Sequence, residues 1–243
     1  MDFLPHFEEF RKRLLIALSV WGIFSVLSYF FSHALIDFFT WPLQASSPQP
    51  LIFQKPYEAF VIHLKAAAFA GLVTASPVIL YQFWMFLAPG LYQTEKKIFM
   101  KIFLISAALF LVGVVFAFFF VMPWGLRFML DFQTEALKPM ISASAYFSFL
   151  LGMLLAFGIL FDFPVILVGL AELGIVKTEW LAKSRRGMVV LIFITAAILT
   201  PSPDPLSQIL LALPLWGLYE ISLAIARRRE KRKGEGRVDS SSV

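Results

Sequence analysis

The hydrophobic positions of this chain form long runs that polar positions interrupt only rarely. A helix needs about 20 apolar residues to cross the hydrocarbon core of a bilayer. Four runs reach that length, so the pattern predicts four transmembrane helices. They cover Leu14 to Ile36, Ala66 to Leu87, Ile102 to Met122, and Phe147 to Leu170.

Two shorter runs follow, Gly187 to Thr200 and Leu206 to Ala226, and the purely apolar centre of the second is only Ile209 to Tyr219. Three prolines between residues 201 and 205 separate them, because a helix cannot run through such a cluster. At 1.5 Å per residue the first run reaches roughly 21 Å, which is less than the bilayer core, so we expect local thinning of the bilayer beside it. The two runs could form a re-entrant hairpin; we favour a short fifth and a short sixth span.

Composition supports a membrane protein. Of the 243 residues, 59% are hydrophobic and 15% charged, and the mean hydropathy is +0.79. A soluble domain is roughly 45–50% apolar and about 25% charged. We therefore expect an all-α integral membrane protein with one domain over residues 1–229 and a disordered cytoplasmic tail over 230–243, which is rich in Gly and Ser. Cysteine is absent, so no disulfide framework is possible.

The basic residues predict the orientation in the membrane. Cytoplasmic loops carry an excess of Lys and Arg. With the N-terminus inside, 17 of the 21 Lys and Arg lie in cytoplasmic segments, and only Lys55, Lys65, Arg127 and Lys138 lie outside. This predicts a multi-pass protein of the cell membrane with both termini in the cytoplasm. Because the net charge of +5 follows from topology, it does not indicate a nucleic-acid partner.

Asp162 lies within the fourth predicted span, where an ionisable residue costs a few kcal/mol and is functional by default. We expect it to face the bundle interior or a water-filled cavity; a protonated acid bonded to a neighbouring helix is the alternative. Pro164 should kink the helix beside it. Glu220 lies near the inner end of the sixth run, where an ion pair or snorkelling explains it as well as function does. Gln82, Thr200 and Gln208 lie near span ends, where hydrogen bonds between helices account for them.

Several enzyme signatures are absent from the sequence. It contains no GxxxxGK[ST] phosphate loop, HExxH zinc pair or GxSxG elbow. The three histidines, His6, His33 and His63, are scattered and do not resemble a metal site. We therefore expect no cofactor, no metal and no enzymatic activity.

The stretch "HFEEFRKRLL", residues 6 to 15, places two acids beside three bases at the edge of the first span. On a helix Glu8 reaches Arg11 and Lys12, and Glu9 reaches Arg13 at i+4, in pairs worth about 0.2–0.5 kcal/mol each. A self-paired helix on the membrane surface is the simplest interpretation.

A second acid favours another interpretation. In "APGLYQTEKK", residues 88 to 97, Glu95 is followed by Lys96 and Lys97, and residues at i+1 and i+2 do not face it on a helix. If the first two spans pack together, Glu9 and Glu95 could share one cytoplasmic surface. Two partly desolvated carboxylates suit guanidinium groups, which bind them bidentately as lysine cannot. The hypothesis is a cytoplasmic site for an arginine-bearing peptide.

The chain also resembles a known family. "ASPVILYQFWMFLAPGLYQTEKK", residues 75 to 97, is similar to the signature region of TatC, the multi-spanning subunit of the twin-arginine translocase. "HFEEFRKRL" resembles its amino-terminal HLxELRxRL pattern, and "AFGILFDFPVILV" its fourth-span motif. "LTPSPDPLSQILLALPLWGLYEIS" resembles the region that joins its last two spans. The resemblance extends from His6 to about Arg229.

The resemblance implies a six-helix concave bundle that binds twin-arginine signal peptides of folded precursor proteins on its cytoplasmic face. It implies single-span partners of the TatA and TatB type, a multi-copy complex in the lipid bilayer, and transport driven by the proton-motive force. The signal-peptide site would contain Glu9, Glu95, Arg11, Leu14 and Phe86. Asp162 would be the acid of the fourth span, and Thr200 and Gln208 would meet partner helices.

Two other classes remain as alternatives. A proton-coupled small-solute transporter would use Asp162, but transporters usually show inverted repeats, and no pseudo-symmetric partner of Asp162 appears in the sequence. An intramembrane enzyme would need a nucleophile and a base at matching depth, which the sequence does not show.

Overall fold

The computed structural model describes residues 3–46, 50–87, 96–131, 140–172, 185–199, 208–209, 212–221 and 223–224. These residues form helices, with one isolated bridge and no strand among them, as the sequence predicts. The chain divides after Gly158 into two compact units, Met1–Gly158 and Ile159–Val243.

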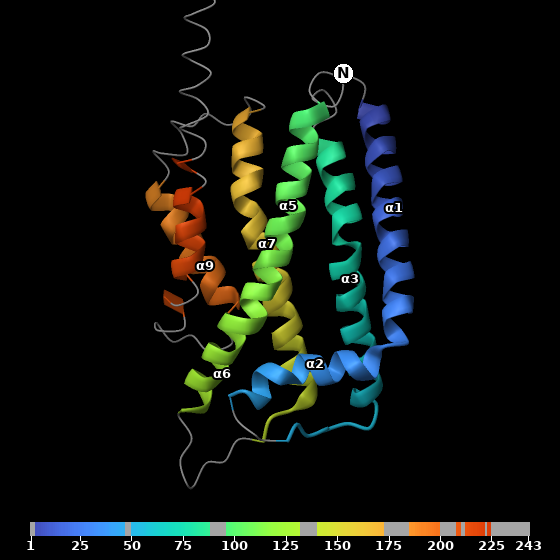
Figure 1. The fold of residues 1–243 in the computed structure, drawn as a ribbon, viewed down its shortest axis with the longest axis vertical. Coiled ribbons are helices and arrows are strands. Elements are labelled where there is room, and N and C mark those ends of the chain that lie inside the picture. Colours follow the sequence, from blue (N-terminus) through green and yellow to red (C-terminus); the bar gives the residue numbers. More distant parts are fainter. Residues whose placement is uncertain are drawn as a thin grey trace, which may run out of the picture. The chain divides into compact units, whose positions relative to one another are not determined.

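The first two helices are joined by a sharp bend. Helix α1 covers Phe3–Tyr29 and α2 covers Ser32–Gln44, and the chain turns by 90° between them (Figure 1). The prediction of one span over Leu14 to Ile36 is therefore wrong at its C-terminal end. The apolar run continues through the bend, and neither Gly nor Pro marks it; Phe31 adopts φ −103° and ψ 12°, a backbone conformation that ends a helix without either residue.

Helix α3, Glu58–Leu87, runs beside α1 in the opposite direction (Figure 1). The two helices meet where Gly71 faces Ser25, because glycine leaves room for the neighbouring backbone. One turn away, the Trp21 indole Nε1 donates a hydrogen bond of 2.9 Å to the Ala68 carbonyl. These contacts fix the pairing of α1 and α3 on which the candidate site depends.

A proline lies inside α3 without ending it. Pro77 has no N–H, so the Val73 carbonyl one turn earlier loses its helical partner. The Ser76 hydroxyl donates to that carbonyl at 2.7 Å, and Ser76 is buried. The neighbouring side chain thus satisfies the polar group that the proline leaves open, and the helix continues to Leu87.

Helix α5, Lys96–Phe116, continues through a π-helical turn, Ala117–Val121, into α6, Met122–Leu130. The turn precedes Pro123, whose missing N–H accounts for the local change in hydrogen bonding. The turn packs on α2, where the rings of Phe38 and Phe118 stack with centroids 4.5 Å apart. The predicted third span, Ile102 to Met122, therefore extends to Leu130.

Helix α7, Ala143–Glu172, carries the main buried face of the first unit. Phe147, Leu150, Leu154 and Phe157 are almost fully buried, and their spacing of three and four residues places them on one side of the helix. The helix continues through Pro164, so the fourth predicted span, Phe147 to Leu170, is contained in one longer helix.

The start of α7 is held by polar contacts. The Tyr146 hydroxyl donates a hydrogen bond of 2.7 Å to the Phe39 carbonyl of α2. The Ile52 backbone pairs with residues 141 to 143, through Ile52 N to the Ile141 carbonyl at 3.0 Å and Ala143 N to the Ile52 carbonyl at 2.9 Å. These bonds join the loop after α2 to the beginning of α7.

The second unit contains α9, Arg185–Leu199, and helical residues at 208–209, 212–221 and 223–224. Helix α9 has 15 residues, as the short fifth run predicts, and is about 22 Å long. The proline cluster and the tail, residues 230–243, lie outside the described residues.

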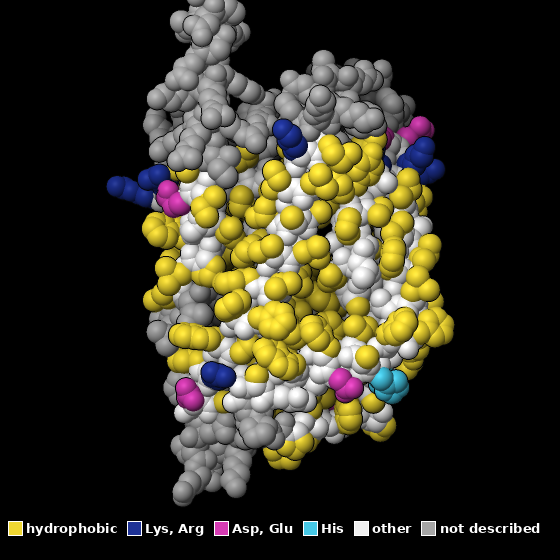
Figure 2. Space-filling model, viewed as in Figure 1, with side chains coloured by type: hydrophobic (Ala, Val, Ile, Leu, Met, Phe, Trp, Pro, Cys, Tyr) yellow, Lys and Arg dark blue, Asp and Glu magenta, His cyan; other side chains and the backbone are white. Residues whose placement is uncertain are grey.

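Within the part of the chain that the structure describes, three helices are long and apolar enough to cross a membrane: Glu58–Phe86, Met100–Leu130 and Ala143–Gly169. The bent pair of α1 and α2 makes a fourth if it counts as one span. Hydrophobic side chains cover the middle of α1, α3 and α5, and charged side chains gather near their ends (Figure 2). This pattern is typical of a multi-pass membrane protein.

Candidate functional site

A groove opens between the beginning of α1 and the end of α3, and we call it the α1–α3 groove. Its volume is about 540 Å³. On its polar side lie four charged residues from two successive turns of α1 and one amide side chain from α3. Three other side chains line the rest of the groove. The lining residues are Glu8, Glu9, Lys12, Arg13, Ile16, Tyr81, Gln82 and Met85.

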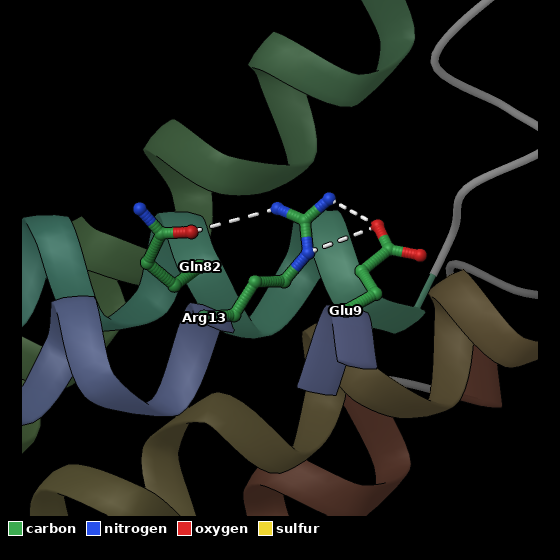
Figure 3. A network of polar contacts seen from close by, with 3 residues as sticks. All are labelled: Glu9, Arg13 and Gln82. Carbon is green, nitrogen blue, oxygen red and sulfur yellow. Dashed lines mark hydrogen bonds and ion pairs between the residues drawn. The ribbon is translucent and has the colours of Figure 1, made fainter. Parts of the chain in front are cut away.

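A network of three side chains crosses the groove (Figure 3). Arg13 Nε donates a hydrogen bond of 3.1 Å to Glu9 Oε1, and Arg13 Nη2 forms an ion pair with the same oxygen. Arg13 Nη1 donates to the side-chain amide oxygen Oε1 of Gln82 on α3 at 3.5 Å. The Arg13 guanidinium therefore lies between a carboxylate of its own helix and an amide of the neighbouring one.

The pairing of Glu9 with Arg13 is the i+4 contact that the sequence predicts. Both side chains remain partly accessible, with 35% of Glu9 and 17% of Arg13 exposed. A partly solvated pair of this kind is weak, about 0.3–1 kcal/mol. The structure also confirms the interhelical hydrogen bond expected of Gln82, whose partner, Arg13, could not be identified from the sequence.

The aromatic ring of Phe86 lies at the same end of α3. Its centroid is 5.3 Å from that of Phe10, so the two helices also meet through this ring pair. Arg11 and Leu14 are exposed on α1. Of the five residues expected in the signal-peptide site, the structure therefore brings Glu9 and Phe86 to one end of the α1–α3 pair, with Arg11 and Leu14 on the adjoining surface. Glu95 lies outside the described residues.

Asp162 belongs to the second unit and lies in α7 with 4% of its surface exposed. Its burial fits the expectation that this acid faces the protein and not the lipid. Glu220 accepts a hydrogen bond of 3.1 Å from Arg185 Nη2, with both side chains partly exposed. The ion pair considered for Glu220 from the sequence is thus present.

Gln208 also lies in the second unit, where its amide donates a hydrogen bond of 2.8 Å to the Phe193 carbonyl of α9. The contact joins the two short helical segments, as the sequence predicts. Thr200 lies outside the described residues. Beside this contact is an apolar groove of about 320 Å³, formed by Val189, Ile192, Phe193, Ile209, Ala212, Leu213 and Trp216.

Among the described residues, no group of three or more His, Asp or Glu side chains could hold a metal ion. Two of the three histidines, although far apart in the sequence, nevertheless lie side by side. The bend between α1 and α2 brings the rings of His33 and His63 into contact, with centroids 4.7 Å apart. The contact could not be predicted from the sequence, because it depends on the bend between α1 and α2, which contains neither Gly nor Pro.

Comparisons with known proteins identify relatives along nearly the whole chain. Residues 5–214 match the family model described as Sec-independent protein translocase protein (TatC). The TatC protein of Desulforapulum autotrophicum is 40% identical over 95% of this chain and 86% of that protein. That of Carboxydothermus hydrogenoformans is 39% identical over 93% of each chain.

A solved structure agrees with the fold. The crystal structure of the twin arginine translocase receptor TatC in DDM superposes with a TM-score of 0.83 at 38% sequence identity. The match covers 91% of this chain and 99% of that one. Both sequence and fold are therefore similar to those of TatC proteins.

Proposed function

The chain belongs to the TatC family of Sec-independent protein translocase proteins, and we propose that it is the receptor for twin-arginine signal peptides. As a TatC protein it is a multi-pass membrane component of twin-arginine translocation. The proposal is more specific: folded precursor proteins dock through their signal peptides on its cytoplasmic face. The similarity of the fold to that of the solved twin arginine translocase receptor supports the proposal.

The observation that carries the proposal is the guanidinium already bound at Glu9. Arg13 places two of its nitrogens on one carboxylate oxygen in the α1–α3 groove. The site is therefore sterically and electrostatically suited to an arginine side chain, whose planar fork bonds carboxylates as an ammonium cannot. A substrate arginine would bind the Glu9 carboxylate in place of Arg13, and Glu95 would receive the second arginine.

The neighbouring residues suit an extended peptide. Phe10 and Phe86 form an aromatic contact between the helices, and Leu14 is an exposed apolar side chain one turn after Arg11. We propose that these side chains contact the residues that flank the two arginines. The apolar part of the signal peptide would then lie along the first spans.

We propose six spans with both termini in the cytoplasm. Four come from the helices described above, and α9 with the following helical residues supplies two short ones. The apolar groove beside Gln208 would receive single-span partners of the TatA and TatB type, with Thr200 at its edge. The complex would contain several copies of the chain and would use the proton-motive force, without a cofactor.

The rival function is a proton-coupled small-solute transporter, and the buried Asp162 is the observation in its favour. An export assay distinguishes the two. In cells that lack their own copy of the protein, wild type should export a folded reporter with a twin-arginine signal peptide, and Glu9→Ala/Glu95→Ala should not. A reporter with twin lysine serves as the control. Export that survives the double substitution would reject the receptor proposal.

A further inference from the structure

Arg13 occupies the carboxylate that the proposed function reserves for a substrate arginine. Glu9 Oε1 accepts Nε at 3.1 Å and pairs with Nη2, so two of the Arg13 donors are directed at one oxygen. A bidentate arginine–carboxylate contact needs both oxygens of the acid. Glu9 therefore cannot offer its full acceptor edge to a second guanidinium while Arg13 stays in place.

The third nitrogen of Arg13 indicates where the side chain could go. Nη1 is 3.5 Å from Gln82 Oε1, which is longer than the usual distance of about 2.9–3.0 Å. A small movement of the guanidinium toward α3 would shorten this bond as the bonds to Glu9 break (Figure 3). Gln82 is thus a second acceptor within reach of a displaced Arg13.

We propose that Arg13 is an internal occupant of the arginine site, bound to Glu9 in the resting protein and transferred to Gln82 when a substrate arginine binds. The inference rests on the proposed function, because it gives the mechanism by which that site is kept closed. It assigns Arg13 a regulatory contact and Gln82 the role of its alternative acceptor.

The exchange is reversible because the resting pair is weak. Glu9 is 35% exposed and Arg13 17% exposed, so water screens their attraction. When Arg13 closes the site most of the time, the apparent affinity for the ligand equals the intrinsic affinity multiplied by the fraction of open sites. For a pair of this strength the reduction is about three- to sixfold. It acts mainly on arginine ligands, because a lysine ammonium can contact the Glu9 oxygen that Arg13 leaves open.

The test measures the affinity of fluorescent twin-arginine and twin-lysine peptides for the detergent-purified full chain. Arg13→Gln should tighten binding of the twin-arginine peptide by about three- to sixfold and that of the twin-lysine peptide less. Gln82→Leu should weaken binding of the twin-arginine peptide, because displaced Arg13 then lacks its acceptor on α3. In the double variant the Gln82 substitution should have no further effect. Arg186→Gln removes an exposed arginine elsewhere and should change neither affinity.

Weaker binding by Arg13→Gln would overturn the inference, since Arg13 would then orient Glu9 for the ligand. Unchanged binding would also overturn it. If Arg13→Gln fails to fold, Arg13→Lys keeps the charge without the fork and should give a smaller gain; no gain counts against the inference. If Glu9→Ala loses the preference for arginine while Arg13→Gln binds the peptides as wild type does, only the role of Arg13 as an internal occupant is rejected. A wild type that binds no better than Glu9→Ala rejects the receptor itself.

Discussion

Gly71 of α3 lies so close to Ser25 of α1 that a Cβ atom at position 71 would be 2.5 Å from the Ser25 Cα and 2.4 Å from its hydroxyl oxygen. Backbone atoms cannot move aside as the end of a flexible side chain can. This close approach of the two helices therefore depends on the absence of a side chain at position 71, and the Trp21 hydrogen bond lies on the same face.

Gly71→Ala should separate α1 from α3. Forcing extra atoms into a packed contact costs about 1–3 kcal/mol, so we expect a lower melting temperature in detergent and weaker binding of the twin-arginine peptide. Gly22→Ala is the matched control, because a Cβ there meets nothing within 4 Å. Equal melting temperatures for the two variants would show that the close contact does not hold the helices together.

The hydroxyl of Ser76 should matter only because Pro77 follows it. Ser76→Ala leaves the Val73 carbonyl without its donor and should destabilise the protein by about 1–2 kcal/mol. Pro77→Ala restores a backbone N–H that can donate to Val73, so the cost of Ser76→Ala should nearly disappear in that background. The measurement is a double-mutant cycle on thermal unfolding. An additive pair would exclude this explanation of the unbroken helix.

The long apolar helices α3, α5 and α7 and the Glu9–Arg13 pair could be predicted from the sequence because both depend on local spacing: a run of about 20 apolar residues, and an acid four residues before a base. The bend after Tyr29 could not, since the apolar run crosses it without Gly or Pro. The contact of His33 with His63 follows from that bend.

The Gln82 contact needs the register of α1 against α3, which a close approach at Gly71 determines. A single amino-acid sequence does not determine the register between two helices. The predicted location of Glu9 and Glu95 on one cytoplasmic surface stays a prediction for a different reason, because Glu95 lies outside the described residues.

Tyr146→Phe should loosen the junction of α7 with α2. The substitution removes a buried hydrogen bond of 2.7 Å and leaves the Phe39 carbonyl without that donor, at a cost of about 1–2 kcal/mol. Tyr57→Phe removes a hydroxyl from a side chain that is 59% exposed and should have little effect. The measurement is the thermal unfolding of both variants. A Tyr146→Phe protein as stable as wild type would contradict the prediction.

Asp162→Asn should slow export if the buried acid acts through its charge, whereas Asp162→Glu should retain most of the rate. Glu220→Gln is the control, because its ion pair with Arg185 is partly exposed and contributes little. The measurement is the export rate of a folded reporter at equal membrane levels of each variant. Wild-type export by Asp162→Asn would mean that the charge has no essential role.

The most direct test of the receptor is the preference of the purified protein for twin-arginine over twin-lysine peptide, on wild type and on Glu9→Ala/Glu95→Ala. A charge-assisted hydrogen bond contributes about 1.5–3 kcal/mol, so each lost acid should weaken arginine binding about tenfold or more. We predict that wild type prefers arginine and that the double variant binds both peptides equally weakly. Equal affinities for both peptides on wild type, unchanged by the substitutions, would contradict the account.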